Sequence, residues 1–153
     1  ETGLAYANAS RDRGWDKERR QIALNIFKSL TRLNPDDTRY PYQIALIYFD
    51  SSMNDGKIDG IEPEGYNDQN KALRIIDDIL KKEPRSVPVK FAKANFFYRL
   101  GKTEEAKTEY IAIKELLEDF KKKGIITEEL KENQSYKNVQ KNLEKIQGQE
   151  KGL

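Results

Sequence analysis

A very short break between two amphipathic helical segments constrains the fold of this chain more than any other feature. From Val87 the apolar residues recur at helical spacing up to Leu100, and Gly101 then ends the helix. Thr103 is the expected N-cap of a second helix, whose own apolar stripe reaches Leu117. Two amphipathic helices joined by so short a turn must lie antiparallel, so this segment is predicted to be a helical hairpin.

Small and aromatic residues occupy regular places in this hairpin. Their order is small residue, aromatic, Leu-Gly turn, small residue, aromatic, carried by Ala94, Phe97, Leu100-Gly101, Ala106 and Tyr110. This order and spacing resemble the signature of the tetratricopeptide repeat family. The two alanines are expected where the helix backbones approach closely, with the aromatics filling the space on either side.

The same pattern recurs upstream. Ala72 precedes Ala106 by about 34 residues, the period of this repeat family. Two segments match the second helix of a repeat, closed by a proline. Their marker residues are Ala23, Phe27, Leu30 and Pro35 in one segment and Ala72, Ile76, Ile79 and Pro84 in the other. A third segment matches the first helix of a repeat, with the marker residues Ile44, Ala45 and Tyr48. Helices are therefore expected over about 17–33, 39–50 and 69–83, with a poorer match over 4–13.

The resemblance implies an all-α fold of antiparallel helical hairpins in a short right-handed tetratricopeptide-like solenoid, closed by a C-terminal capping helix. Residues 4–123 are expected to form three hairpins, with an acidic insertion at 51–70. Residues 124–147 are expected to hold the capping helix, with Thr127 as its N-cap, and 148–153 a frayed tail. Residues 1–3 are interpreted as a remnant of expression or processing, so the chain is expected to be part of a longer protein.

The composition argues against catalysis and against several ligand classes. The chain has no Cys and no His, which removes thiolate chemistry, the commonest general base and the commonest transition-metal ligand. Net charge is only +2, so neither nucleic acid nor a membrane surface is an expected partner. No apolar run is long enough for direct insertion into a bilayer. We therefore expect a protein that is not an enzyme and has no cofactor.

The acidic insertion leaves calcium binding open as an alternative function. Its segment from Asp55 through Asp59 to Glu62 partly resembles an EF-hand calcium loop, with Glu62 at the bidentate position. Ser51 and Met53 stand where that loop needs oxygen ligands, which lowers the expected affinity. The preferred interpretation is a solvated acidic loop without a metal, and a calcium-responsive regulatory domain is the alternative.

The first helix of each hairpin lines the concave groove in the tetratricopeptide family. The resemblance thus implies a partner-binding groove of aromatic residues flanked by arginines, which suits another protein or a peptide. An equal alternative is that these side chains pack against the chain's own C-terminal helix or insertion. The expected groove residues are Arg39, Tyr42, Leu46, Phe49, Phe91, Asn95, Tyr98 and Arg99.

Taken together, the sequence predicts a protein–protein interaction module, an adaptor or scaffold that is monomeric alone. Its Lys-, Ile- and Asn-rich composition and the expected processing favour a bacterial cell-envelope protein on the periplasmic side over a cytoplasmic one. A structural role in self-association through the stripe from Tyr136 to Ile146 is a further alternative.

Overall fold

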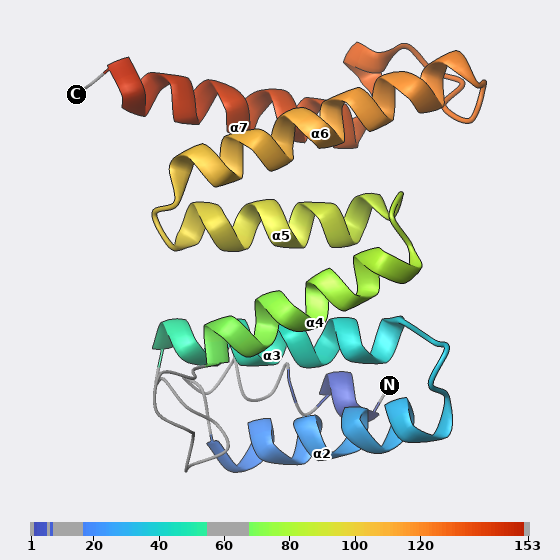
Figure 1. Cartoon of the computed structure of the whole chain (residues 1–153), viewed down its shortest axis with the longest axis vertical. Helices are drawn as coiled ribbons and strands as arrows, with labels where there is room; N and C mark the ends of the chain where they lie inside the picture. Colours follow the sequence, from blue (N-terminus) through green and yellow to red (C-terminus); the bar gives the residue numbers. More distant parts are fainter. Residues whose placement is uncertain (1, 6, 8–16, 55–67, 152–153) are drawn as a thin grey trace. The chain divides into compact units, whose positions relative to one another are not determined.

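The computed structural model describes residues 2–5, 7, 17–54 and 68–151 (Figure 1). These residues form helices joined by short turns, with no strand in the described ranges. The predicted all-α fold of helical hairpins is therefore confirmed. The chain divides into two compact units, residues 1–84 and 85–153, and each is described by itself.

The first unit is built from α2 (Lys17–Leu33), α3 (Arg39–Asn54) and α4 (Asp68–Lys82). The central helix α3 packs against both α2 and α4 (Figure 1). The predicted helices over 17–33 and 69–83 are confirmed to within one residue. Helix α3 is longer than the predicted 39–50, so the predicted insertion at 51–70 is helical at its described ends, 51–54 and 68–70.

The core of this unit follows the predicted repeat pattern. Its buried residues include Ala23, Leu24 and Phe27 of α2, Ile44, Ala45, Ile47 and Tyr48 of α3, and Ala72, Ile76 and Ile79 of α4. The three alanines have no exposed surface, and a residue this small lets a helix backbone come close to its neighbour.

The first described residues contact helix α2. Residues 2–5 are helical, and Gly3 is buried against the ring of Phe27. A Cβ at Gly3 would lie 2.8 Å from that ring, so the close approach depends on glycine. Gly3 therefore belongs to the packing of α2, and the interpretation of residues 1–3 as a remnant stays a prediction.

The second unit holds α5 (Val87–Arg99), α6 (Thr103–Lys122), the 3₁₀ turn η1 (Leu130–Glu132) and α7 (Gln134–Lys151). Helices α5 and α6 form the predicted antiparallel hairpin, and α7 packs on α6 (Figure 1). One apolar cluster joins the helices; its buried members are Ala94, Ala106, Tyr110, Ile113, Leu117, Ile126, Val139 and Ile146. Ala94 and Ala106 are fully buried, as the resemblance implied.

Glycine closes both helices of the hairpin in the same way. Gly101 has a φ of 78° and Gly124 a φ of 75°, values at which side chains with a Cβ are strained. After α5, the Lys102 N–H donates to the Phe97 carbonyl at 2.9 Å, and the Gly101 N–H donates to the Tyr98 carbonyl at 3.1 Å. This Schellman pattern satisfies the last carbonyls of the helix and turns the chain back.

Two details of the predicted helix starts are wrong. Thr103 is the first residue of α6 rather than its N-cap, a place held by Lys102, which makes no side-chain capping bond. The last helix does not begin at Thr127. It begins at Gln134, because the Asn133 side chain accepts the Tyr136 N–H at 3.0 Å and so caps the helix there.

The expected fraying from Gly148 is also wrong, since α7 continues to Lys151. Its last turn is held by side chains of the hairpin. Gln149 donates to the Tyr98 hydroxyl at 2.9 Å, and Glu150 lies 3.3 Å from the Lys107 ammonium. These contacts offset the weak helix propensity of Gly148.

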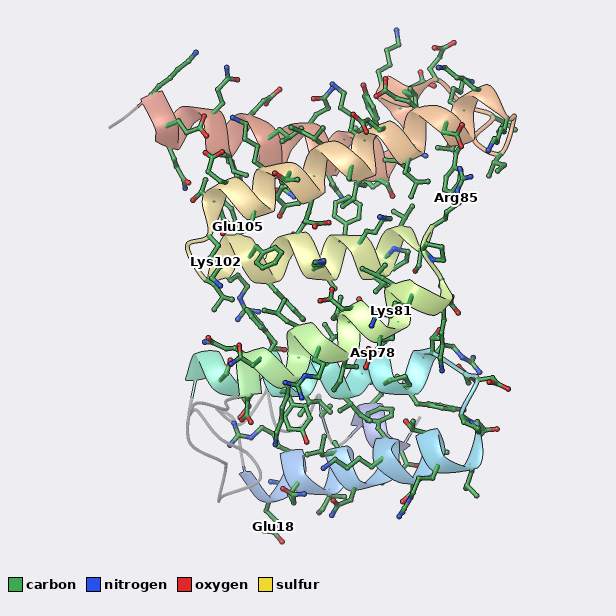
Figure 2. All side chains as sticks on the ribbon, in the orientation of Figure 1. Glu18, Asp78, Lys81, Arg85, Lys102 and Glu105 are labelled. Atoms are coloured by element: carbon green, nitrogen blue, oxygen red, sulfur yellow. The ribbon has the colours of Figure 1, made fainter. Side chains whose placement is uncertain are left out.

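A small charged cluster anchors the end of α6. Asp119 accepts hydrogen bonds from the Lys123 ammonium, at 3.0 Å, and from the Arg85 guanidinium, which also stacks on Phe120. Figure 2 shows Arg85 beside the end of α6. The bonds from Lys123 and Arg85 hold the pKa of Asp119 below its ordinary value of 3.8.

The close contact at Ala106 can be tested by enlargement. Ala106→Leu should overpack the α5–α6 contact and lower the free energy of unfolding by about 1–3 kcal/mol. Thermal and urea denaturation followed by circular dichroism measure this. Ala112→Leu, at a partly exposed position of the same helix, is the matched control. Equal effects of the two substitutions would contradict the close approach.

The Asp119 cluster predicts a pH-dependent stability. A carboxyl with a lowered folded-state pKa stabilises above its unfolded pKa, and that stability is lost as the pH falls through the folded pKa. Asp119→Asn should therefore lower the melting temperature at pH 7, and the gap to wild type should close as the pH falls well below 3.8. Glu118→Gln controls for removing one charge from the same turn. A gap independent of pH would refute the role of the ionised carboxylate.

Candidate functional site

Helix α3 presents a mixed apolar and polar surface, here named the α3 face and defined by Arg39, Tyr42 and Leu46. Tyr42 and Leu46 are partly buried and lie one turn apart. Burial raises the pKa of the Tyr42 phenol, and its hydroxyl makes no hydrogen bond to any residue that the structure describes. It stays neutral at physiological pH and can donate to a ligand carbonyl.

Arg39 marks the start of the α3 face. Its side chain is largely exposed and pairs with Asp37 at 2.6 Å, and the same carboxylate accepts the Arg39 N–H at 3.1 Å. These bonds lower the pKa of Asp37. The guanidinium is thus positioned at the helix N-terminus with donors left over for another group.

Phe49 does not belong to this face, contrary to the prediction. It has no exposed surface, whereas Leu46 and Tyr42 are partly exposed. The reason is helical geometry: Phe49 follows the buried Ala45 by four residues and so shares its inward stripe. In this structure Phe49 is a core side chain and is not available to a partner.

Helix α5 carries the other predicted contact residues, here named the α5 face and defined by Phe91, Asn95 and Tyr98. Phe91 packs on Tyr110 with ring centroids 6.4 Å apart. Asn95 accepts a hydrogen bond from the Tyr110 hydroxyl at 2.5 Å. Two of the three side chains are therefore engaged by the partner helix of their own hairpin.

The third side chain of the α5 face contacts the C-terminal helix. The Tyr98 hydroxyl accepts the amide of Gln149, in the last turn of α7. The alternative that the chain's own C-terminal helix packs on these residues therefore holds for Tyr98. Arg99, predicted beside it, is exposed.

The Tyr110 phenol, which contacts the α5 face from α6, remains neutral at physiological pH. Burial raises the pKa of Tyr110 to about 12, with a smaller contribution from Tyr98. Because its hydroxyl already donates to the Asn95 amide oxygen, Tyr110 has a structural role here and not the geometry of a base or nucleophile.

The part of the chain that the structure describes has no cluster of side chains that could bind a metal ion. No group of three or more His, Cys, Asp or Glu side chains gathers there. Asp55, Asp59 and Glu62, the residues of the calcium alternative, lie outside the described residues.

None of the described helices is long and apolar enough to cross a membrane.

Sequence reasoning missed one feature of α3. On another side of this helix, the ammonium groups of Lys28 and Lys71 lie over the Tyr48 ring, 5.7 and 4.9 Å from its centroid. Tyr48, a marker residue of the repeat pattern, is buried. Each lysine is next to a repeat marker, Phe27 or Ala72, so the repeat register could have placed both beside the core.

Comparison with known proteins gives matches among solved structures. No family model matches the chain, and no curated protein matches it. The Yersinia enterocolitica type III secretion translocator chaperone SycD, in an alternative dimer, matches with a TM-score of 0.61 at 14% identity, over 97% of this chain and 91% of that one.

Two peptide complexes are similarly close. PcrH in complex with the chaperone binding region of PopD matches with a TM-score of 0.62 at 14% identity, over 97% of this chain and 90% of that one. The Y. enterocolitica SycD complex with a peptide of the translocator YopD has a TM-score of 0.59 at 14% identity, over 97% and 92%. These likenesses show the fold, a tetratricopeptide-like array of helical hairpins.

The contact between α5 and α7 predicts a local change in dynamics. Tyr98→Phe removes the acceptor of Gln149, so amide hydrogen exchange in the last turn of α7, residues 148–151, should become several-fold faster. The melting temperature should change little, because the ring stays in place. Tyr136→Phe, which removes the acceptor of Gln140 near the start of α7, is the control. Unchanged exchange at 148–151 would show that the hydrogen bond does not hold the helix end.

Proposed function

We propose that this chain is a protein-binding module that holds a segment of a partner protein on the α3 face. The observation that carries the proposal is the state of Tyr42 and Leu46. Both are partly exposed, and the phenol has no hydrogen-bond partner among the described residues. A partly buried aromatic beside an aliphatic residue, with Arg39 at the edge, is typical of a binding hot spot.

The fold supports this choice. The similar structures include two chaperones seen with a segment or peptide of another protein. Helical hairpins suit such ligands, because a short segment with a few apolar anchors can lie along the exposed side of a helix. The partner is accordingly a short peptide segment with an apolar anchor for Tyr42 and Leu46.

The α5 face has a secondary role in this proposal. Phe91, Asn95 and Tyr98 already contact α6 or α7, so a ligand there must displace existing contacts. That displacement costs binding free energy, whereas the Tyr42 hydroxyl of the α3 face has no hydrogen bond to a described residue that a ligand must break. The expected location in the bacterial cell envelope stays a prediction, and nothing in the structure or in the comparisons supports it.

Site-specific photo-crosslinking in the source cells tests the proposal. A photoreactive phenylalanine analogue at position 42 or 46 should crosslink one and the same partner protein. The same analogue at Lys145, exposed on α7, is the control. Tyr42→Ala with Leu46→Ala should reduce recovery of that partner by about tenfold with the melting temperature near normal. Crosslinking that is equal at 145, or recovery unchanged in the double variant, would refute the α3 face as the binding surface.

A further inference from the structure

The last turn of α7 is held to its unit by polar groups. We name residues 147–151 the C-terminal turn; it lies beyond the last buried side chain of the helix and has no apolar side chain of its own. Gln149 donates to the Tyr98 hydroxyl at 2.9 Å, and Glu150 lies 3.3 Å from the Lys107 ammonium. Because the C-terminal turn adds nothing to the apolar cluster of the unit, both contacts can break without opening that cluster.

Gly148 makes the C-terminal turn easier to unwind. Glycine in a helix interior is less stable than alanine, because its backbone loses more freedom on folding. Packing does not require a glycine here, since a Cβ at this position would meet no other group within 4 Å and the residue is not among the glycines with a positive φ. The helix thus has a weak position between the buried Ile146 and the two polar contacts, so the C-terminal turn can open while the rest of α7 stays packed.

Opening the C-terminal turn frees two neighbouring groups, the Tyr98 hydroxyl of α5 and the Lys107 ammonium of α6. The C-terminal turn lies at the end of the unit where α5 turns into α6 (Figure 1). Two consecutive residues, Gln149 and Glu150, contact the two groups, so both lie within reach of two adjacent residues of a ligand. We name these two groups the Tyr98–Lys107 site.

We propose that the C-terminal turn occupies the Tyr98–Lys107 site in place of a partner segment that carries a side-chain amide followed by a carboxylate. The chemistry of the two contacts selects this ligand, because an amide N–H replaces that of Gln149 and a carboxylate replaces that of Glu150. Phe91 lies two turns before Tyr98 on the same side of α5, about 10 Å away, and takes an apolar residue of the same segment. The site is separate from the α3 face and shares with the proposed function only the premise that the ligand is a protein segment.

The strength of the C-terminal turn sets the affinity of the site. One hydrogen bond and one exposed ion pair together favour the closed form by about tenfold. A ligand that needs the open form binds with an affinity lowered by the fraction of molecules that are open. Substitutions that open the turn should therefore tighten binding, and substitutions that stabilise it should weaken binding.

Titration of the isotope-labelled full chain, followed by NMR, tests the site with a defined probe. The probe is an N-acetylated, C-amidated peptide, Phe-Ala-Ala-Gln-Glu, in which about 10 Å of extended chain separates Phe from Gln. Its control is Phe-Ala-Ala-Ala-Ala. The probe should shift the backbone amide resonances of Tyr98 and Lys107 saturably, and the control peptide should bind at least about tenfold more weakly.

Two variants on α7 move the affinity in opposite directions. Gln149→Ala with Glu150→Ala removes both contacts from the α7 side and should tighten probe binding by about tenfold. Gly148→Ala raises the helix propensity of the C-terminal turn and should weaken probe binding by about threefold to fivefold. Amide hydrogen exchange at 147–151 should become faster in the first variant and slower in the second, with circular dichroism near that of wild type in both.

The same contacts can be removed from the other side as a matched control. Tyr98→Phe with Lys107→Gln also opens the C-terminal turn, and hydrogen exchange at 147–151 should rise as much as in the Gln149 and Glu150 variant. It removes the groups that the ligand needs, so it should bind the probe at least about tenfold more weakly than that variant does. A purely structural contact would give the two double variants the same affinity for the probe.

Four results would overturn the inference. The Gln149 and Glu150 variant could fail to bind the probe saturably up to about millimolar concentration. The control peptide could bind as tightly as the probe, or the two double variants could bind the probe equally. Gly148→Ala could slow the exchange of the C-terminal turn and leave the affinity unchanged. Crosslinking at Tyr42 and Leu46 does not depend on any of these measurements, so the proposed function on the α3 face fails or stands separately.

Discussion

The close approach of α5 and α6 at Ala94 and Ala106 is the contact on which the second unit depends. Both alanines are fully buried, and the apolar cluster of the unit surrounds them. Because the backbones come near each other there, the larger side chains on either side can interdigitate, which brings Tyr110 to Phe91 and Asn95. The contacts of Phe91 and Asn95 with Tyr110 thus depend on two small residues.

Glycine and polar caps then fix where each helix stops, and those ends decide which surfaces remain open. The left-handed residues Gly101 and Gly124 reverse the chain after α5 and α6. Asn133 caps the start of α7. This helix is long enough for Gln149, in its last turn, to form a hydrogen bond with Tyr98 of α5. In the first unit, by contrast, the face of α3 with Tyr42 and Leu46 stays partly exposed, so the two units offer surfaces of different availability.

Local patterns predicted the helices well, because apolar periodicity and a Leu-Gly turn report on packing within one hairpin. They failed where a residue outside the local pattern determines where a helix begins or ends. Thr127 looked like a cap, yet Asn133 holds the hydrogen bond, and Gly148 stays helical because Lys107 and Tyr98 bind the residues beside it. Phe49 is buried and Leu46 partly exposed because the two residues lie on different sides of α3. The family signature does not distinguish these two sides. The pairing of Lys28 and Lys71 over Tyr48 joins three helices, so no single segment of sequence could predict it.

In our proposal, helix α3 holds the partner on the side that carries Tyr42 and Leu46, and Ile44 lies on another side of the same helix. Methyl-resolved NMR of the chain with its crosslink-identified partner distinguishes them most directly, since Leu46 and Ile44 report on the two sides. The account predicts that the Leu46 methyl resonances shift on adding the partner segment while those of Ile44 stay in place. A shift confined to Ile44 and Ile75, with Leu46 unmoved, would contradict the assignment of the principal partner to the α3 face.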